Sequence, residues 1–586
     1  MATVRSFAFL IVLLGSSTCL WAAERPNVIV ILADDQGWGD LSINGNRNLK
    51  TPQIDSLARS GAMFDRFFVQ PVCSPTRAEF LTGRYHPRGG VWNVSTGGER
   101  LNLDERTLAD ELRGAGYATG CFGKWHNGTQ YPYHPRGRGF DEYYGFTSGH
   151  WGDYFDPPLD HNGKSVTGKG FLPDDLTDRA IEFIDKSRSR PFFAYLAFNT
   201  PHSPMQVPDE YFNRFRAAEL KQRGSGAQKE DIEHTRAALA MMENLDANVG
   251  RVLKALDERK LADDTIMIYF SDNGPNAARW NGGMKGRKGS TDEGGVRSPL
   301  LVRWPKRIQP GTTIKEIAGA IDLAPTILEL TGTKRNGTKP FDGRSLAPLL
   351  TGKGSNWPDR LLFAHWNGKV SARTQRYRLD ADGKLFDMVS DPEQKRDIAK
   401  SEPEAATKLA KAVRDYRAEI LKDIRNDTRP FPVGYAEFPI AQLPARDGVP
   451  SGGVKRSANA PNCSFFTNWT KPDDAIAWKV EVRTAGTYDV ELGYTCPKDS
   501  VGSTVELSLG ERVLSGKVTE PHDPPLRGKE NDRVPRVGES YVKDFRPLKL
   551  GTIDLPAGTG TLKLRATAIP GPMVMDLRGL TLTLRK

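Results

Sequence analysis

Near its N-terminus the chain carries the stretch Asn27-Val28-Ile29-Val30-Ile31-Leu32-Ala33, which Asp34 and Asp35 follow directly. The run is continuously apolar and rich in β-branched residues, a pattern typical of a strand buried on both faces of a parallel sheet. Similar runs occupy 117–122, 191–198 and 265–270, and helical patterns cover 108–116 and 231–260. Because strands and helices alternate, the sequence predicts an α/β unit with a mainly parallel sheet flanked by helices.

Polar residues follow each of these predicted strands. In open α/β sheets, ligands bind outside the carboxyl ends of the strands. We therefore expect one crevice to gather side chains that are far apart in the sequence. These side chains are Asp34, Asp35, Lys124, His126, His202, Asp272 and Asn273.

The acidic strand ends are candidate metal ligands. Asp34, Asp35, Asp272 and Asn273 offer hard oxygen donors, which suit Ca²⁺ or Mg²⁺ better than Zn²⁺. No cysteine and histidine cluster in the chain has zinc spacing. For each acidic pair taken alone, the alternative is a helix cap or a solvated turn.

The pattern changes after residue 356. The chain of 586 residues is long enough for several domains. Residues 24–356 form the predicted α/β unit, and 357–425 predict a small antiparallel-sheet subdomain with one helix. Residues 426–461 are rich in Pro and Gly and predict a linker or wrapped segment. Residues 462–586 alternate in the manner of a β-sandwich.

The first 23 residues have the pattern of a secretory signal peptide. Arg5 precedes an apolar run over 7–14, and Ala22-Ala23 offer a cleavage site. The run is too short to span a bilayer, so we expect export to the periplasm or exterior without stable membrane insertion. Lipidation of Cys19 is the less favoured alternative. In an exported protein Cys463 and Cys496 are candidates for a disulfide.

The net charge is +10, and the pI is about 9.1. A basic surface favours anionic partners by electrostatic steering. The chain has no nucleic-acid module and no compact Lys/Arg run, so no nucleic-acid partner is expected. A sulfated polymer is one partner that fits this charge. The alternative is a solvated basic surface that binds no anionic partner.

One segment carries a complete catalytic signature. Cys73-Ser74-Pro75-Thr76-Arg77, with Thr82-Gly83, fills every specified position of C-x-P-[ST]-R-x(4)-T-G. Gly123-Lys124-Trp125-His126 resembles the core of a second signature, although Phe122 and Asn127 depart from its usual residues. Residues 288–299 match the pattern K-G-[ST]-x-x-E-G-G-x-R-x-P. Residues 385–393 resemble the pattern L-[YF]-D-x(3)-D-P-x-E.

Over about residues 25–424 these motifs resemble the type I, formylglycine-dependent sulfatases of the alkaline phosphatase superfamily. The match is arylsulfatase-like and similar to secreted bacterial polysaccharide sulfatases. The resemblance implies an alkaline-phosphatase-like fold and sulfuric ester hydrolysis. It also implies that a maturation enzyme oxidises Cys73 to formylglycine, whose hydrate attacks sulfur.

Position by position, the resemblance implies roles for the rest of the site. Asp34, Asp35, Asp272 and Asn273 hold a divalent cation, most often Ca²⁺, which also touches the matured Cys73. Arg77 and Lys124 stabilise the diol. His202 and Lys288 face the bridging oxygen, so that one of them protonates the leaving alcohol. His126 deprotonates the remaining diol hydroxyl.

The predicted substrate is a sulfated carbohydrate. The chain combines a predicted signal peptide, a positive net charge and a predicted β-sandwich that is similar to carbohydrate-binding jelly rolls. Histidine, arginine and tryptophan side chains outside the motifs are candidates for binding sugar rings or further sulfates. They are His134, Arg136, His150, Trp151, His365 and Trp366. The alternative for each is an ordinary core or loop position.

The sequence also fits two other functions. A phosphodiesterase or phosphonate monoester hydrolase can share the cysteine signature and the metal site. If Cys73 is never oxidised, a non-catalytic glycan-binding protein is the remaining alternative.

Overall fold

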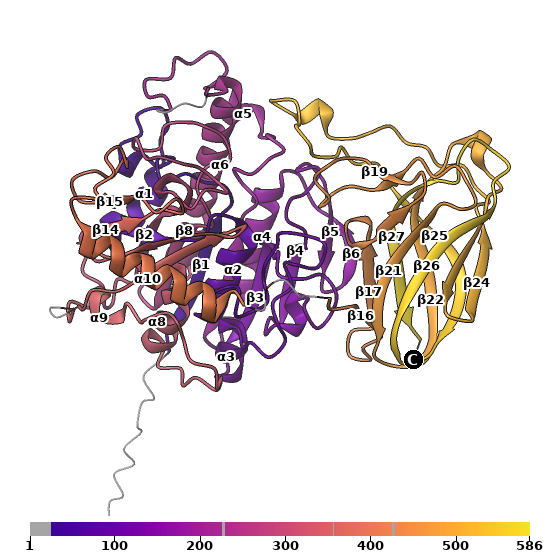
Figure 1. Cartoon of the computed structure of the whole chain (residues 1–586), viewed down its shortest axis with the longest axis horizontal. Helices are drawn as coiled ribbons and strands as arrows, with labels where there is room; N and C mark the ends of the chain where they lie inside the picture. The colour runs from indigo at the N-terminus through magenta and orange to yellow at the C-terminus, as the bar shows by residue number, and fades with distance from the viewer. Residues whose placement is uncertain (1–24, 225–228, 355–356, 423, 425–427, 586) are drawn as a thin grey trace, which may run out of the picture.

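The computed structural model describes residues 25–224, 229–354, 357–422, 424 and 428–585. A larger α/β unit lies beside a C-terminal β unit (Figure 1). The predicted signal peptide, 1–23, lies outside the described residues.

An 11-stranded sheet forms the centre of the α/β unit, in the order β10-β2-β9-β8-β1-β7-β3-β4-β5-β6, with β11 paired to β2. Its middle strands are β8 (Thr265–Ser271), β1 (Asn27–Ala33), β7 (Phe192–Ala197) and β3 (Ala118–Lys124). They run parallel, and every residue in them is buried. The outer strands are β2 (Ala62–Phe68), β9 (Arg297–Arg303), β10 (Thr312–Ile314), β11 (Ala318–Gly319), β4 (Glu142–Phe146), β5 (Pro158–His161) and β6 (Lys164–Thr167).

Helices cover both faces of this sheet, which confirms the predicted fold class. Alternate residues of β1 enter separate cores: Ile31 packs in one core and Val30 in the other. The first core includes residues of α1 (Pro52–Arg59), α4 (Leu172–Lys186), α5 (Asp209–Phe212) and α6 (Ile232–Glu258). The second includes residues of α2 (Cys73–Thr82), α3 (Leu108–Gly114), α8 (Leu323–Leu330) and α9 (Ala347–Leu350).

A small antiparallel sheet follows, as predicted. Its strands are β12 (Leu362–Trp366), β13 (Lys369–Arg373), β14 (Tyr377–Leu379) and β15 (Leu385–Asp387). Leu409 of α10 (Pro403–Ile420) packs with Ala372, Leu379 and Leu385 of this sheet. The subdomain lies against the α/β unit, since Phe68 of β2 shares a core with Leu362.

The C-terminal unit is a sandwich of two 6-stranded sheets. One contains β16 (Phe431–Val433), β18 (Val449–Ser451), β21 (Ala475–Val482), β23 (Thr504–Leu509), β24 (Arg512–Lys517) and β26 (Gly558–Ala568). The other contains β17 (Ile440–Pro444), β19 (Lys455–Arg456), β20 (Phe466–Thr467), β22 (Gly486–Thr495), β25 (Arg546–Leu555) and β27 (Asp576–Leu584). Trp469, Trp478 and Tyr488 fill the core between them.

The predicted linker or wrapped segment, 426–461, differs from the structure. It contains β16, β17, β18 and β19, so the sandwich begins by Phe431 rather than at residue 462. These strands are short, and three of them contain proline. Proline is tolerated at sheet edges and strand ends, and there it hides a strand pattern in the sequence.

Among the described residues Cys73, Cys121, Cys463 and Cys496 are all free thiols. The predicted candidate pairing of Cys463 with Cys496 is therefore not formed. None of the helices in the described part of the chain is long and apolar enough to cross a bilayer.

Truncation of a buried β1 side chain is expected to destabilise the α/β unit. Ile31 is fully buried, so Ile31→Ala leaves a cavity and should lower its free energy of unfolding by about 2–5 kcal/mol in urea titrations. Val513→Ala, at a side chain 53% exposed, serves as the control. Equal midpoints for the two variants would contradict this packing.

Candidate active site

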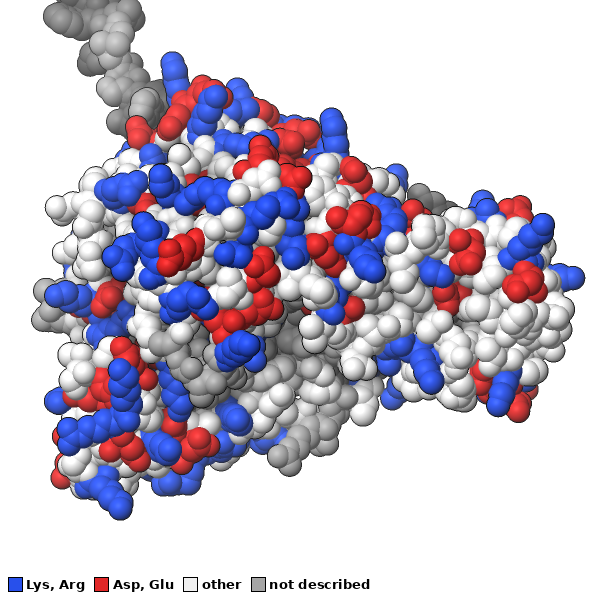
Figure 2. Space-filling model, turned by 90° about the horizontal axis from the view of Figure 1, so that it is seen from above, with Lys and Arg blue, Asp and Glu red and all other residues white. Residues whose placement is uncertain are grey.

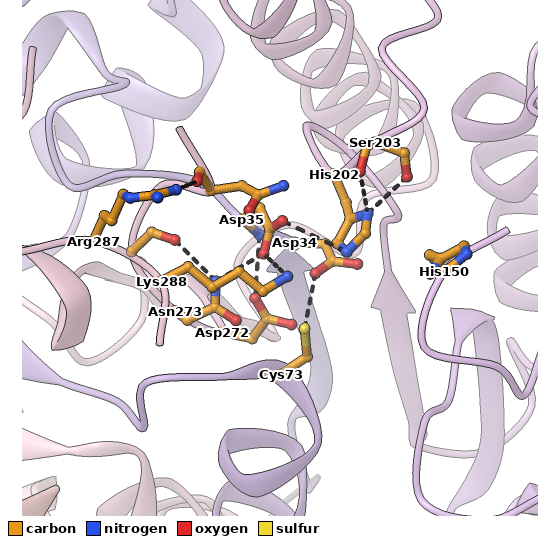
Figure 3. A network of polar contacts seen from close by, with 12 residues as sticks. Asp34, Asp35, Cys73, His150, His202, Ser203, Asp272, Asn273, Arg287 and Lys288 are labelled. Atoms are coloured by element: carbon orange, nitrogen blue, oxygen red, sulfur yellow. Dashed lines mark hydrogen bonds and ion pairs between the residues drawn. The ribbon is translucent and has the colours of Figure 1, made fainter. Parts of the chain in front are cut away.

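Acidic side chains meet where β1 and β8 end. The two strands are parallel neighbours, and Ala33 lies opposite Ser271, so the residues that follow them leave the sheet together. The backbone N–H of Asp35 donates a hydrogen bond to Asp272 Oδ1 at 3.3 Å. Asp35 adopts a left-handed conformation (φ 65°), which Asp tolerates better than most residues. Figure 3 shows these side chains pointing toward one another.

This cluster has the donors that a hard divalent cation requires. Ligand atoms of Asp34, Asp35, Cys73 and Asp272 lie within 4.8 Å of one another, and all four residues are buried. Asn273 Nδ2 donates to Asp35 Oδ1 at 2.8 Å. Asn273 Oδ1 and Asp35 Oδ2 are buried without a hydrogen-bond partner. Buried acceptors of this kind are costly unless they bind something, and oxygen donors fit Ca²⁺ or Mg²⁺.

Two buried cations balance these carboxylates. Arg77 Nη2 and Nε lie 2.8 Å and 3.1 Å from Asp272 Oδ2. Lys124, the last residue of β3, places its Nζ 2.6 Å from Asp34 Oδ2. Arg77 Nη1 also donates to the Lys124 carbonyl at 2.6 Å, so the two cations are held in one network.

Helix α2 positions two of these residues at once. Cys73 and Arg77 are four positions apart and therefore lie on one face of the helix. Thr76 Oγ1 donates to the Asp272 carbonyl at 2.6 Å, which fixes the first turn to the end of β8. Cys73 Sγ consequently lies 3.5 Å from Asp34 Oδ1.

The thiol of Cys73 is a poor nucleophile as it stands. Burial raises its pKa to about 12, although Lys124 and Lys288 oppose that shift. At neutral pH the side chain is therefore a protonated thiol. A thiolate is the reactive form of cysteine, so this site does not activate an unmodified cysteine.

Asp35 interacts with a third cation and with a histidine. Lys288 Nζ is 2.6 Å from Asp35 Oδ1, and His202 Nε2 is 3.6 Å from Oδ2. Burial alone would raise the pKa of Asp35, but His202, Lys288 and Lys124 hold it well below its usual value. Burial alone would lower the pKa of Lys288, but Asp35, Cys73 and Asp34 raise it. Both groups are therefore charged at neutral pH.

His126 is held as a neutral base. Its Nε2 lies 2.7 Å from the Val94 carbonyl and so carries the ring proton. Nδ1 is buried without a partner, which leaves its lone pair free. Burial, with Lys124 adding to it, moves the pKa of His126 well below its usual value. In this neutral form Nδ1 is the ring atom available to accept a proton.

The sulfatase family profile matches residues 26–333 of this chain. The chain belongs to the sulfatase family. It is a sulfuric ester hydrolase of the alkaline phosphatase superfamily. The profile described as N-sulphoglucosamine sulphohydrolase, C-terminal, matches residues 288–419. Sulfatases use a metal ion and formylglycine, and the buried Asp and Cys group is consistent with that metal site.

Two curated relatives share just under a third of their aligned residues with this sulfatase. The steryl-sulfatase of Mus musculus is 31% identical over 450 residues, covering 60% of this chain and 69% of that protein. The N-acetylgalactosamine-6-sulfatase of Mus musculus is 30% identical over 389 residues, covering 60% and 71%.

Solved structures show the same fold. The crystal structure of Ps i-CgsB has a TM-score of 0.62 and 32% identity, covering 67% of this chain and 93% of that one. The same protein has been solved in complex with k-i-k-neocarrahexaose. A phosphonate monoester hydrolase of Agrobacterium radiobacter has a TM-score of 0.53 and 21% identity, covering 68% and 97%, which shows the fold alone.

Hydrogen bonds and ion pairs link most of the predicted catalytic and metal-binding residues of the sulfatase: Asp34, Asp35, Cys73, Arg77, Lys124, His202, Asp272, Asn273 and Lys288. His126 lies close enough to Lys124 for that cation to lower its pKa, and its ring bonds to the Val94 carbonyl. Of the predicted substrate-binding residues, His150 lies beside them. Its ring is 5.9 Å from that of His202, at 21°. Trp151 stacks on Phe146 at 5.1 Å.

The other predicted substrate-binding residues make different contacts. His134 is buried, and its Nε2 lies 3.2 Å from Asp160 Oδ2. Arg136 donates to the Phe140 carbonyl. His365 is buried and stacks on His86 at 5.3 Å. Trp366 ends β12, opposite Lys369.

One residue beside the site was not predicted from the sequence. Glu539, from the C-terminal sandwich, accepts a hydrogen bond from Ser203 Oγ at 2.6 Å, and its Oε1 lies 4.0 Å from His150 Nδ1. It belongs to none of the sulfatase motifs and lies in a segment with no periodic pattern. No sequence signal marks it.

Cation binding is expected to stabilise this sulfatase. When only the folded protein binds a ligand, that ligand at 100 times its Kd adds about 2.7 kcal/mol to the free energy of unfolding. Calcium added to EDTA-treated protein should therefore raise the melting temperature, and Asp35→Asn should remove most of the rise. Glu511→Gln, at an exposed position, is the control. An undiminished rise in Asp35→Asn would place the cation elsewhere.

Proposed function

We propose that this sulfatase removes sulfate from a sulfated carbohydrate, with Cys73 matured to formylglycine and a divalent cation held by Asp34, Asp35, Asp272 and Asn273. The observation that carries the proposal is a pair of buried acceptors beside Cys73 that accept no hydrogen bond, Asp35 Oδ2 and Asn273 Oδ1. We further propose that a formylglycine-generating enzyme is the maturation partner, and that the protein is exported.

The charges of the site favour a sulfate ester. Three carboxylates, those of Asp34, Asp35 and Asp272, face three cations, those of Arg77, Lys124 and Lys288. With all six ionised, a bound divalent cation leaves a net charge of about +2, which attracts a monoanionic ester. When bound, the cation polarises a sulfate oxygen and orients the nucleophile.

The proposed ion is Ca²⁺ in preference to Mg²⁺. The three carboxylates and the amide supply several oxygen donors from two loops, which suits the flexible coordination of Ca²⁺ at six to eight ligands. Mg²⁺ demands near-octahedral geometry and keeps several waters, whereas the donor residues here are almost fully buried.

Residues of the chain itself carry out separate steps of the proposed reaction. A formylglycine hydrate at position 73 supplies an oxygen nucleophile and a second hydroxyl through which sulfate is released. Arg77 and Lys124 stabilise the negative charge that develops around it. His126 Nδ1, with its free lone pair, accepts the proton of the second hydroxyl.

The leaving alcohol takes its proton from His202 Nε2 or Lys288 Nζ. His202 Nδ1 donates to the Ser203 carbonyl at 2.7 Å, so Nε2 is the atom left for proton exchange. Burial lowers the pKa of His202 to about 4, against the opposing effect of Asp35. The ring is therefore neutral in the free protein, and Nε2 must first take up a proton before it can donate one to the leaving alcohol. Lys288 keeps its proton at neutral pH, because its pKa is raised.

The carbohydrate part of the proposal rests on three observations. Ps i-CgsB, a solved relative at 31% identity, was crystallised with k-i-k-neocarrahexaose. A curated relative is an N-acetylgalactosamine-6-sulfatase. The net charge of +10 favours polyanions. On the face shown in Figure 2, basic side chains are interspersed with acidic ones, which favours local recognition of sulfate over a nucleic-acid stripe.

Loss of Cys73 is expected to abolish sulfatase activity. Mass spectrometry of protein from the native host should show formylglycine at position 73, and Cys73→Ala should lower kcat/KM by at least ~10³-fold. Cys121→Ala, which removes another buried thiol, should keep activity. A persistent thiol in active native protein would overturn the mechanism, and a strong preference for phosphate diesters would overturn the substrate class.

The loss of activity in His202→Ala should depend on the leaving group of the substrate. General acid catalysis contributes about 10²–10⁴-fold when the leaving group needs a proton. With His202 as the donor, the loss should be of that order on a sugar sulfate and small on 4-nitrophenyl sulfate, whose phenolate leaves readily. With Lys288 as the donor, Lys288→Ala should show this pattern instead. Equal losses in kcat on both esters would exclude His202 as the proton donor.

A further inference from the structure

One loop of the C-terminal sandwich folds back onto the α/β unit. It joins β24 to β25 and comprises residues 518–545, the β24–β25 loop. In Figure 1 a yellow segment extends from the sandwich toward α5. Arg533 N–H donates to the Met205 carbonyl at 2.9 Å, and Gln206 Nε2 donates to Asp532 Oδ1 at 2.9 Å. The loop is therefore bound to the segment that carries His202.

Contacts within the sandwich hold the loop around Glu539 in one conformation. The buried Arg536 side chain pairs with Asp532 at 2.9 Å and donates to the Ser540 carbonyl at 2.8 Å. Ser540 Oγ contacts Ser457 Oγ at 2.7 Å, and Ala460 N–H donates to the Gly538 carbonyl at 2.8 Å. Both neighbours of Glu539 are thus anchored.

Glu539 lies on the accessible side of the active site. The side chains of Arg77, Lys124 and Asp35 are fully buried. Those of Lys288 and Glu539 are 18% and 13% exposed. Lys288 and Glu539 are thus more accessible to solvent than the buried groups of the site. A substrate whose sulfate entered among the buried groups would have its alcohol part on the side of Lys288 and Glu539.

The chemistry of Glu539 sets what it can recognise there. Its Oε1 accepts from Ser203, and among the described residues no donor is bonded to its Oε2. Burial alone would raise the pKa of Glu539, but His150, His202, Ser203 and Lys288 lower it. An ionised carboxylate accepts hydrogen bonds from hydroxyl groups and repels a second anion.

We propose that Glu539 is a specificity-determining residue, supplied by the C-terminal sandwich, that accepts hydrogen bonds from hydroxyl groups of the sugar bearing the sulfate ester. It selects against sugars with a second sulfate or a carboxylate at that position. The inference rests on the proposed carbohydrate sulfatase function. It gives the sandwich a direct part in the active site, beyond the region that the family profiles match.

The test uses the matured, calcium-loaded full-length enzyme. Wild type is first assayed on 4-nitrophenyl sulfate, which has no sugar hydroxyls, and on monosulfated and disulfated galactose, N-acetylgalactosamine and glucosamine. Glu539→Gln keeps the shape of the side chain and removes its charge. Glu530→Gln removes a charge at an exposed position of the same loop and is the matched control.

Glu539→Gln should lower kcat/KM on the best monosulfated sugar by about 10- to 100-fold, the loss expected for hydrogen bonds to a charged group. The change should fall mainly on KM, and activity on 4-nitrophenyl sulfate should stay within about twofold. The ratio of disulfated to monosulfated turnover should rise. Glu539→Asp, which keeps the charge, should preserve the wild-type ratio, and Glu530→Gln should match wild type on every ester.

Two results would overturn the inference alone. Equal losses on the aryl and sugar esters would show that Glu539 only supports the fold of the site, and unchanged sugar kinetics would show no role. The proposed function fails in a different way, visible in wild type: turnover of 4-nitrophenyl sulfate without any sugar sulfate refutes the carbohydrate substrate and this inference with it.

Discussion

The structure of the active site depends on one constraint: three carboxylates are forced together in the interior. β1 and β8 are parallel neighbours that end in register, so Asp34, Asp35 and Asp272 leave the sheet side by side. Placing three carboxylates close together in the protein interior is energetically unfavourable unless cations compensate their negative charge. Burial, with Asp34 adding to it, raises the pKa of Asp272 to about 6 even though Arg77 and Lys124 oppose that rise. The cluster therefore requires cations around it.

The compensating cations come from separate elements of the fold. Arg77 comes from α2, Lys124 from the end of β3 and Lys288 from the loop before α7 (Glu293–Val296). Lys124 and Lys288 also lie near Cys73, since both lower the pKa of its thiol against the effect of burial. Groups that neutralise the carboxylates in the free protein are thus in place to neutralise a sulfate ester and its nucleophile.

Most residues of this site were predictable, because each belongs to a short sequence pattern even though the patterns lie far apart in the chain. Asp34 and Asp272 each follow an apolar strand, and Cys73 and Arg77 belong to one short signature. Glu539 was not predictable, because its position depends on how the β24–β25 loop folds back onto the segment around Ser203. The short strands near Phe431 and Pro450 were missed for a related reason. Their pairing partner, β21, lies further along the chain, and proline conceals their strand pattern.

The buried oxygens of Asp35 and Asn273 that accept no hydrogen bond are proposed to belong to a cation site that holds the sulfate against residue 73. A crystal structure of the matured protein grown with CaCl₂ and soaked with a sulfate ester tests it directly. We expect one cation bound by Asp34, Asp35, Asp272 and Asn273, with a sulfate oxygen and the oxygen of residue 73 completing its ligands. A sulfate bound elsewhere, or these four side chains without a cation while Ca²⁺ occupies another site, would contradict it.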